Sequence, residues 1–190
     1  MNKIIALDIG NVCVTLRHDL ALGALGYKSL GDIPQDFLKA TEMMERGLMP
    51  EDDWLEVYRK SSGSELGGDK LRSTWNLIIG AEIEGMADAV RMAVNKGFRV
   101  IFFSDTSDLH ITEVYRNLSF AHLVSGAIFS FREGAKKPES RMYDAFEKEY
   151  GKPSYYTDDM PQNIEAALKR GWNAGIFTGA KSFFDAIDSL

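Results

Sequence analysis

A short apolar run near the start of the chain ends abruptly at an acidic residue. Residues 4–7 (IIAL) are all apolar, Asp8 follows them directly, and Gly10 comes two residues later. A continuous apolar run with β-branched residues is typical of a strand buried on both faces of a parallel sheet. A carboxylate at the carboxyl end of such a strand lies where open α/β sheets bind their ligands. Alternatively, Asp8 only starts a turn, and the rest of the chain must decide between these interpretations.

The overall charge and the cysteine content exclude several classes of protein. The chain has 190 residues, a formal net charge of −6 and no block rich in Lys and Arg, so nucleic acid is not an expected partner. The apolar start is too short for a signal peptide and no stretch reaches membrane-spanning length, so no membrane partner is expected. The single cysteine, Cys13, rules out an internal disulfide and indicates a reducing, cytoplasmic location.

The segment between residues 16 and 84 has the pattern of a helical module. Pro34 and Pro50 occupy positions typical of a first helical turn, and acidic residues follow Pro50 as the helix dipole prefers. No strand pattern is evident in this segment. We therefore predict a small helical domain, residues 16–84, inserted into an α/β domain made of residues 1–15 and 85–190.

From Gly85 onward, the pattern changes to alternating helices and strands. After the first strand, further strands are expected at residues 98–103, 127–129, 154–157 and 173–177, with helices between them. Strands that alternate with helices of this size indicate a mostly parallel sheet covered by helices on both faces. The predicted fold class is therefore α/β, with a parallel sheet core and an inserted helical domain.

Polar residues follow three of these strands. Asp8 ends the first, Ser104 and Asp105 follow the second, and Asp158 and Asp159 follow a later one. Because the carboxyl ends of parallel strands lie along one edge of the sheet, these groups can converge. Adjacent acids repel each other unless a cation or a basic partner lies near them. The pair at positions 158 and 159 therefore favours a cation site.

This combination of residues suits phosphoryl chemistry. Carboxylates and a backbone carbonyl are hard oxygen ligands of the kind that Mg²⁺ prefers, and Mg²⁺ pairs with phosphate. A carboxylate beside the metal can attack phosphorus to give an aspartyl-phosphate. A serine hydroxyl, backbone N–H groups and a lysine, Lys136 or Lys137, would hold the transferring oxygens. Alternatively, Ser104 only caps a turn and Lys137 is a solvated surface charge.

Together, four motifs in this order resemble those of the haloacid dehalogenase (HAD) superfamily of hydrolases. They are LDIGNV around Asp8, IFFSDTS around Ser104, GAKKPESRMY around Lys137 and YYTDDMPQNIEAALKRGW around Asp159. The resemblance covers nearly the whole chain and implies a Rossmann-like core, with the helical domain in place of this superfamily's C1-type cap. DIGNV and the DD…NIEAA tail are most similar to bacterial sugar-phosphate phosphatases of the α-glucose-1-phosphate phosphatase group.

The resemblance implies a role for each motif residue on the phosphate side of the site. Asp8 would be the nucleophile. Ser104 would bind the phosphoryl group together with the backbone amide of Asp105. Lys137, which directly precedes the proline of its motif, would neutralise the nucleophile and the phosphate, and Lys136 is the second candidate for this role.

The resemblance also implies a Mg²⁺ site. Asp8 and the backbone carbonyl of Gly10 would bind the metal. Asp159 would supply the metal-binding acid, because its spacing to Asn163 matches the pattern of the superfamily. Asp158 would be a further ligand or would lie directly behind the ligands.

Two positions depart from the pattern of the superfamily. Most of its phosphatases have a second Asp, a general acid and base, two residues after the nucleophile, where this chain has Gly10. General acid–base help is worth about 10²–10⁴-fold, so we expect a preference for good leaving groups such as anomeric sugar, aryl or acyl phosphates. Asp105 stands where the resembling proteins often have Asn. If its carboxylate pointed inward, it would repel the substrate.

The sequence therefore predicts an enzyme, a Mg²⁺-dependent phosphatase that acts on a small phosphorylated metabolite, with a sugar phosphate favoured by resemblance alone. One alternative is a catalytically silent binding or regulatory module, which Gly10 and Asp105 favour but the retention of Asp8, Lys137 and Asp159 opposes. Another is a 2-haloacid dehalogenase. Dehalogenases of this superfamily also lack the second Asp, and they need no metal. The inserted helices are expected to set specificity, and the chain is expected to be a monomer or a homodimer.

Overall fold

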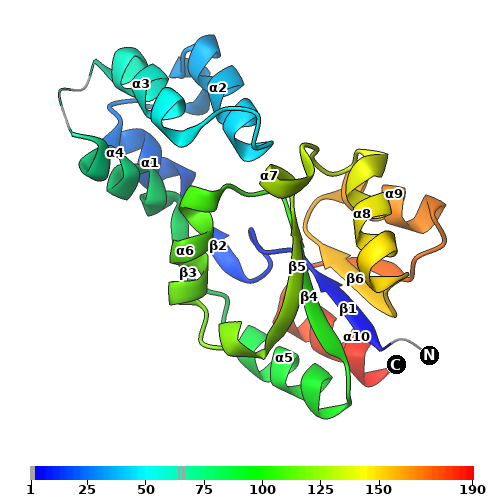
Figure 1. Ribbon diagram of the computed structural model, residues 1–190. Coiled ribbons are helices and arrows are strands. Elements are labelled where there is room, and N and C mark those ends of the chain that lie inside the picture. Colours follow the sequence, from blue (N-terminus) through cyan, green and yellow to red (C-terminus); the bar gives the residue numbers. More distant parts are fainter. Residues whose placement is uncertain (1–2, 64, 66) are drawn as a thin grey trace.

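The computed structural model describes residues 3–63, 65 and 67–190, and a parallel β-sheet lies at its centre (Figure 1). The sheet has five strands in the order β5-β4-β1-β6-β7. In chain order they are β1 (Ile4–Leu7), β4 (Arg99–Ser104), β5 (Val124–Phe129), β6 (Tyr155–Asp158) and β7 (Ala174–Ile176). The predicted α/β class with a parallel sheet is thus confirmed.

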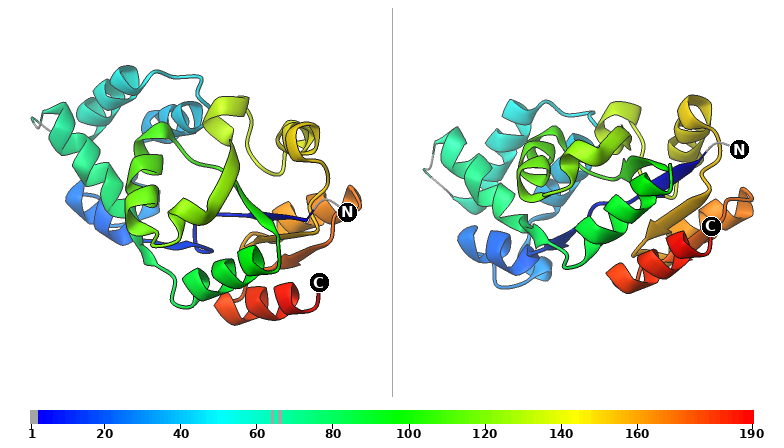
Figure 2. Two further views of the ribbon diagram at one scale, coloured as in Figure 1. Left: turned by 60° about the horizontal axis from the view of Figure 1, so that its bottom comes forward. Right: turned by 90° about the horizontal axis from the view of Figure 1, so that it is seen from below.

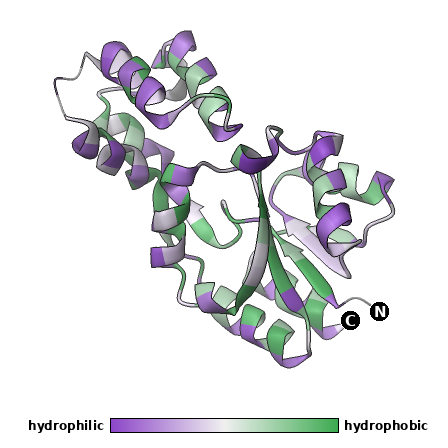
Figure 3. Ribbon diagram, viewed as in Figure 1, coloured by the Kyte–Doolittle hydropathy of each residue, from purple (hydrophilic) through white to green (hydrophobic). Residues whose placement is uncertain are grey.

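Helices cover both faces of this sheet, because the side chains of β1 alternate between two apolar cores. Ile5 and Leu7 belong to one core, and Ile4 and Ala6 belong to the other. The first core includes residues of α5 (Met86–Asn95), α6 (Asp108–Asn117) and α10 (Ala180–Asp188). The second includes residues of α8 (Ser140–Tyr150) and α9 (Pro161–Lys169). Figure 2 shows α5 and α10 side by side, and Figure 3 shows β1 and β4 as mainly hydrophobic.

We call residues 16–84 the insert. In its described part, four α-helices lie apart from the sheet (Figure 1). They are α1 (His18–Ala24), α2 (Gln35–Glu45), α3 (Glu51–Ser62) and α4 (Gly68–Trp75). α3 follows Pro50, has three acidic residues in its first turn and ends at Gly63, whose φ of 62° is left-handed. The buried rings of Phe37 and Trp75 pack on Trp54, with centroids 5.8 Å and 5.1 Å away. The insert therefore has an apolar core of its own.

The expectation that no strand interrupts the insert is wrong. β3 (Ile79–Glu82) follows a 3₁₀ turn, η2 (Asn76–Ile78), and pairs antiparallel with β2 (Val14–Leu16). In the sequence, the apolar residues 77–79 continue the pattern of α4, so the helical periodicity hides the strand. A long-range contact decides the outcome. A Cβ at Gly80 would lie 2.2 Å from Thr15 Oγ1, so glycine is needed for the two strands to approach.

Three further short elements were not predicted from the sequence. They are η1 (Leu30–Asp32), η3 (Ala121–Leu123) and α7 (Ser130–Glu133). Within the described ranges, no helix combines the length and the apolar composition that crossing a membrane requires. The division into residues 1–15 and 85–190 on one side and 16–84 on the other stays a prediction, and its residues 1, 2, 64 and 66 lie outside the described part.

Candidate active site

The carboxyl ends of three neighbouring strands meet around one cleft. Asp8 follows β1, Ser104 is the last residue of β4, and Asp158 is the last residue of β6. Because β1 lies between β4 and β6, these residues come from adjacent strands. The cleft has a volume of about 250 Å³, and the buried Asp158 is not among the residues that line it. The other predicted site residues line it, namely Asp8, Gly10, Ser104, Asp105, Lys137 and Asp159.

A buried lysine joins two of the acids. Lys137 Nζ lies 2.7 Å from Asp8 Oδ1 and 2.6 Å from Asp158 Oδ2, and it donates a hydrogen bond to the Phe103 carbonyl at 2.8 Å. The side chains of Lys137 and Asp158 are 2% and 0% exposed. A buried charge is unfavourable without a partner. The lysine and the two carboxylates therefore hold one another in place.

The neighbouring lysine points away from the cleft. Lys136 Nζ lies 2.5 Å from Glu45 Oε2 at the end of α2. The next residue of the insert, Arg46, pairs with Glu139 at 2.6 Å. The two adjacent lysines thus have different partners, because Lys137 contacts the acids of the cleft and Lys136 contacts the insert. Of the two candidates that the sequence left open, the geometry favours Lys137.

Asp158 is surrounded by hydrogen-bond donors. Its carboxylate accepts bonds from the Tyr156 hydroxyl, from Asn163 Nδ2 at 3.0 Å and from the Met160 backbone N–H at 2.8 Å. The sequence pattern linked Asn163 to Asp159 through their spacing, but in the structure Asn163 bonds to Asp158. Tyr156 and Met160 were not singled out from the sequence, where only their nearness to Asp158 could have suggested them. Several donors around one carboxylate favour its ionised form and fix its orientation.

Burial and ion pairing shift the pKa values in opposite directions. Burial raises the pKa of the Asp8 carboxyl above its usual value, and Lys137 only partly opposes this. Burial acts in the same way on Asp158, but Lys137 and the surrounding donors lower its pKa below the usual value. Burial would lower the pKa of Lys137, but the two acids raise it. Lys137 is therefore charged with Asp158 as its ionised partner, and the negative charge of Asp8 is only partly compensated.

Three carboxylates lie close enough to share one cation. Oxygen atoms of Asp8, Asp158 and Asp159 lie within 4.8 Å of one another. Asn11 Nδ2 donates a hydrogen bond to Asp159 Oδ2 at 3.2 Å and so orients this acid. Lys137 pairs with the other two acids, so one ammonium group faces three carboxylates. An excess of hard oxygen ligands is the environment that a small divalent cation such as Mg²⁺ prefers.

The space beside Gly10 is filled by another side chain. A Cβ added at Gly10 would lie 2.9 Å from Leu16 Cδ1. Leu16 follows a tight turn in which the backbone N–H groups of Cys13 and Val14 both donate to the Ile9 carbonyl. Position 10 thus carries no acid or base, and a methyl group lies where one would project. The sequence shows the missing acid but not the role of Leu16, because that contact depends on how the turn folds back.

Asp105 holds the loop that carries Lys137. Its Oδ1 accepts a hydrogen bond from the Lys137 backbone N–H at 3.0 Å. Burial raises the pKa of the Asp105 carboxyl, although Lys137 opposes the shift. The buried Ser104 hydroxyl reaches the Asp105 carbonyl only at 3.5 Å, a long contact that leaves the hydroxyl available to a ligand. Asp105 is therefore engaged with the loop, and Ser104 is the hydroxyl presented to the cleft.

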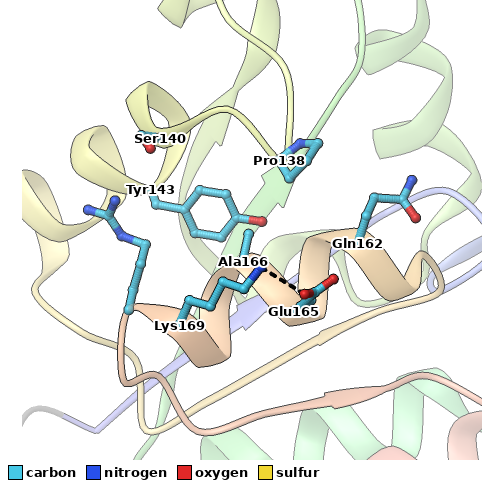
Figure 4. A pocket seen from close by; sticks show the side chains of 8 residues that line it. Pro138, Ser140, Tyr143, Gln162, Glu165, Ala166 and Lys169 are labelled. Carbon is cyan, nitrogen blue, oxygen red and sulfur yellow. Dashed lines mark ion pairs between the residues drawn. The ribbon is translucent and has the colours of Figure 1, made fainter.

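A larger cavity, of about 380 Å³, lies elsewhere, between α8 and α9 (Figure 4). Its charged side chains already have partners. Lys169 pairs with Glu165 at 2.7 Å, and Arg170 pairs with Glu147 at 3.2 Å. The three clustered carboxylates lie outside it. The smaller cleft at the strand ends is therefore the better candidate for chemistry.

No family model and no curated protein matches this sequence, but solved structures do. A HAD family enzyme from Bacteroides thetaiotaomicron, solved with magnesium and inorganic phosphate, matches with a TM-score of 0.81 and 17% identity over 94% of this chain and 96% of that one. A structure described as a predicted HAD-like family hydrolase, from Porphyromonas gingivalis, matches with a TM-score of 0.80 and 15% identity over 100% and 98% of the two chains.

A third match is an L-2-haloacid dehalogenase from Xanthobacter autotrophicus with chloropropionic acid covalently bound. Its TM-score is 0.64 and its identity 12%, over 92% of this chain and 76% of that one. At these identities the comparisons establish a shared fold, which confirms the resemblance expected from the motifs at that level. They do not select the reaction, because one fold can carry different chemistry.

Proposed function

We propose that this chain, which has the fold of HAD family enzymes, is a Mg²⁺-dependent phosphatase acting on a small phosphorylated metabolite, with a sugar phosphate as the favoured class. One observation carries the proposal. The buried carboxylate of Asp8 faces the ammonium group of Lys137 and also two further carboxylates, those of Asp158 and Asp159. A divalent cation shared by these acids would balance their charge and attract a phosphate to Asp8.

The chain's own residues account for the steps of hydrolysis. Bound at Asp8, Asp159 and the Gly10 carbonyl, Mg²⁺ would supply Lewis acidity toward the phosphoryl oxygens. The Asp8 carboxylate attacks phosphorus, so an Asp–O–P bond forms while the bond to the leaving oxygen breaks. Lys137 and the Ser104 hydroxyl bind the phosphoryl oxygens as their charge develops. Water then attacks phosphorus, its proton passes to solvent, and the bond between Asp8 and phosphorus breaks, which releases inorganic phosphate and regenerates the carboxylate.

Gly10 restricts the leaving groups that the enzyme can release rapidly. Because no side chain at position 10 can protonate the leaving oxygen, that oxygen takes its proton from solvent. The rate should therefore fall steeply as the pKa of the leaving alcohol rises. In the double variant Gly10→Asp/Leu16→Ala, which introduces an acid and removes the methyl group 2.9 Å away, this dependence should flatten. A native rate that does not vary with the leaving-group pKa would contradict the proposal about Gly10.

The two alternatives make different demands on the cleft. A 2-haloacid dehalogenase attacks carbon without a metal, and that reaction would leave the excess negative charge of the carboxylates around Asp8 without a cation. Gly10 and Asp105 both favoured a silent module in the sequence, but the Asp105 carboxylate accepts a bond from the Lys137 N–H, so only Gly10 still favours it. Such a module would bind Mg²⁺ and phosphate without turnover.

Phosphate release from a panel of sugar, aryl and acyl phosphates, with Mg²⁺ and with chelator, tests the proposal. Asp8→Asn should abolish turnover and chelator should do the same. The two lysines supply a matched control, because Lys137→Met removes the partner of Asp8 whereas Lys136→Met removes the partner of Glu45. We expect turnover to be lost only in the first. Chelator-resistant turnover, or equal loss in both lysine variants, would refute the proposed mechanism.

Several sequence predictions remain outside these observations. They are the cytoplasmic location, the absence of a nucleic-acid partner and the monomeric or homodimeric state. Size-exclusion chromatography with light scattering would decide the oligomeric state.

A further inference from the structure

A second, smaller cavity adjoins the cleft. It has a volume of about 90 Å³ and shares Gly10, Leu16 and Ser104 with the cleft at the strand ends. From there it extends toward the insert, where Ile78 and His110 line it. The cavity is therefore within reach of a group attached to a phosphate in the cleft. Its lining is mixed, because Ile9, Ile79 and Val114 are apolar whereas His18, Glu45 and Thr106 are polar. A polar atom without a partner is therefore the informative feature.

His110 supplies an unpaired polar atom at this cavity. The residue lies in α6 and is 5% exposed, and its Nε2 has no hydrogen-bond partner among the residues that the structure describes. The ring stacks on Trp75, with centroids 5.3 Å apart and planes at 18°. The ring also forms a hydrogen bond with the Trp75 backbone. Because Nε2 is unpaired, this bond belongs to Nδ1, which leaves Nε2 as the free nitrogen.

The imidazole is neutral at physiological pH. Burial lowers the pKa of His110 to about 4, and the charge of nearby His18 acts in the same direction. With its proton on Nδ1, the neutral ring offers a lone pair at Nε2. Such an atom attracts a hydrogen-bond donor and has no charge to attract a phosphate. A buried acceptor without a hydrogen-bond donor is unfavourable, so a ligand that donates a hydrogen bond to Nε2 should bind more tightly.

We propose that this cavity is the leaving-group subsite and that His110 Nε2 accepts a hydrogen bond from a hydroxyl group of the substrate. The inference rests on the proposed phosphatase function and narrows its substrate class. The substrate is therefore a phosphomonoester that carries a hydroxyl group near its phosphate, as a sugar phosphate does, and His110 determines specificity for that hydroxyl.

Two substrates and two variants test this role. Glycerol 1-phosphate and propyl phosphate have the same chain length, but only the first carries hydroxyl groups. His110→Gln places a polar atom near the position of Nε2, whereas His110→Asn places one near Nδ1 and leaves the Nε2 position empty. The ratio of kcat/KM for the two substrates, compared between proteins, cancels the intrinsic difference between the leaving groups.

We expect the preference for glycerol 1-phosphate to fall roughly tenfold in His110→Asn and to be largely retained in His110→Gln, as one hydrogen bond would predict. Trp75→Phe, which alters the packing of the ring but not Nε2, should leave the preference unchanged. An unchanged preference in His110→Asn, or an equal fall in both His110 variants, would overturn the inference, since a purely structural histidine gives one of these results.

A binding measurement separates this inference from the proposed function. In Asp8→Asn protein labelled with ¹⁵N-histidine, the Nε2 signal of His110 should move upfield with glycerol 1-phosphate and Mg²⁺ but not with propyl phosphate. The signal that disappears when His110→Asn is added belongs to His110. A shift without turnover in the native enzyme would refute the phosphatase and retain the subsite. Turnover without a shift would refute the subsite and retain the phosphatase.

Discussion

The cleft and the insert differ in what holds their interiors together. In the cleft, the carboxylate of Asp158 accepts bonds from Lys137 and from the Tyr156 hydroxyl. In the insert, the Tyr58 hydroxyl and Trp75 Nε1 are buried without a partner among the described residues. The comparison shows that electrostatics organise the cleft, whereas the insert is held by apolar area and ring packing. Removing a polar atom should therefore be costly in one region and tolerated in the other.

The largest expected effect comes from the two adjacent lysines. Lys137→Met leaves two buried acids unpaired, which costs roughly 3–5 kcal/mol in the free energy of unfolding. Lys136→Met removes a partly exposed ion pair with Glu45, worth about 1 kcal/mol or less. Urea unfolding of both variants measures the difference. Equal losses would show that the cleft does not depend on its central charge.

Metal binding should stabilise the cleft by a somewhat smaller amount. Mg²⁺ at a hundredfold excess over its dissociation constant raises the free energy of unfolding by about 2.7 kcal/mol if it binds only the folded chain. The gain should disappear in Asp159→Asn, which removes one of the three clustered carboxylates. Thermal unfolding with Mg²⁺ and with chelator measures it. An equal gain in the variant would place the cation elsewhere.

The pH dependence of stability tests the neutral histidine at the boundary of the two regions. The pKa of His110 is about 4 in the folded chain, against about 6.5 when unfolded, so the unfolded state binds more protons below pH 6.5. The contribution of neutral His110 to the free energy of unfolding is constant above pH 6.5 and is lost as the pH falls toward 4. Between pH 7.5 and pH 5, the native chain should lose about 2 kcal/mol more than His110→Gln. Parallel pH profiles would contradict the neutral, buried state of His110.

The smallest effect is expected from two tyrosine hydroxyls. Tyr156→Phe removes a donor to Asp158 and should cost about 1–2 kcal/mol. Tyr58→Phe removes a buried hydroxyl that has no partner in the described part of the chain, so the free energy of unfolding should stay equal or rise slightly. Equilibrium unfolding of both variants makes the comparison. A clear loss in Tyr58→Phe would reveal a partner such as a buried water.

Local pattern predicted the sheet and the convergence of polar residues at one of its edges. The apolar run of β1 and the alternating helices after Gly85 indicate a parallel sheet, because a strand buried on both faces must be apolar throughout. Polar residues directly after such strands must then lie at one edge, which is how Asp8, Ser104 and Asp158 were found. The pattern failed at residues 79–82, which form β3 and pair with β2 instead of remaining in a purely helical segment.

The sequence by itself thus determined the fold class and which acids meet at the strand ends, because these depend on periodicity and on the order of elements along the chain. Only the tertiary structure decided which lysine enters the cleft, where the Asp105 carboxylate points and what lies beside Gly10. The same holds for His110, whose free nitrogen has no signature in the sequence. The first three outcomes depend on how loops fold back onto distant residues, and the last depends on how α6 packs against Trp75. Side-chain direction in loops is set by such long-range contacts, and no local pattern encodes it.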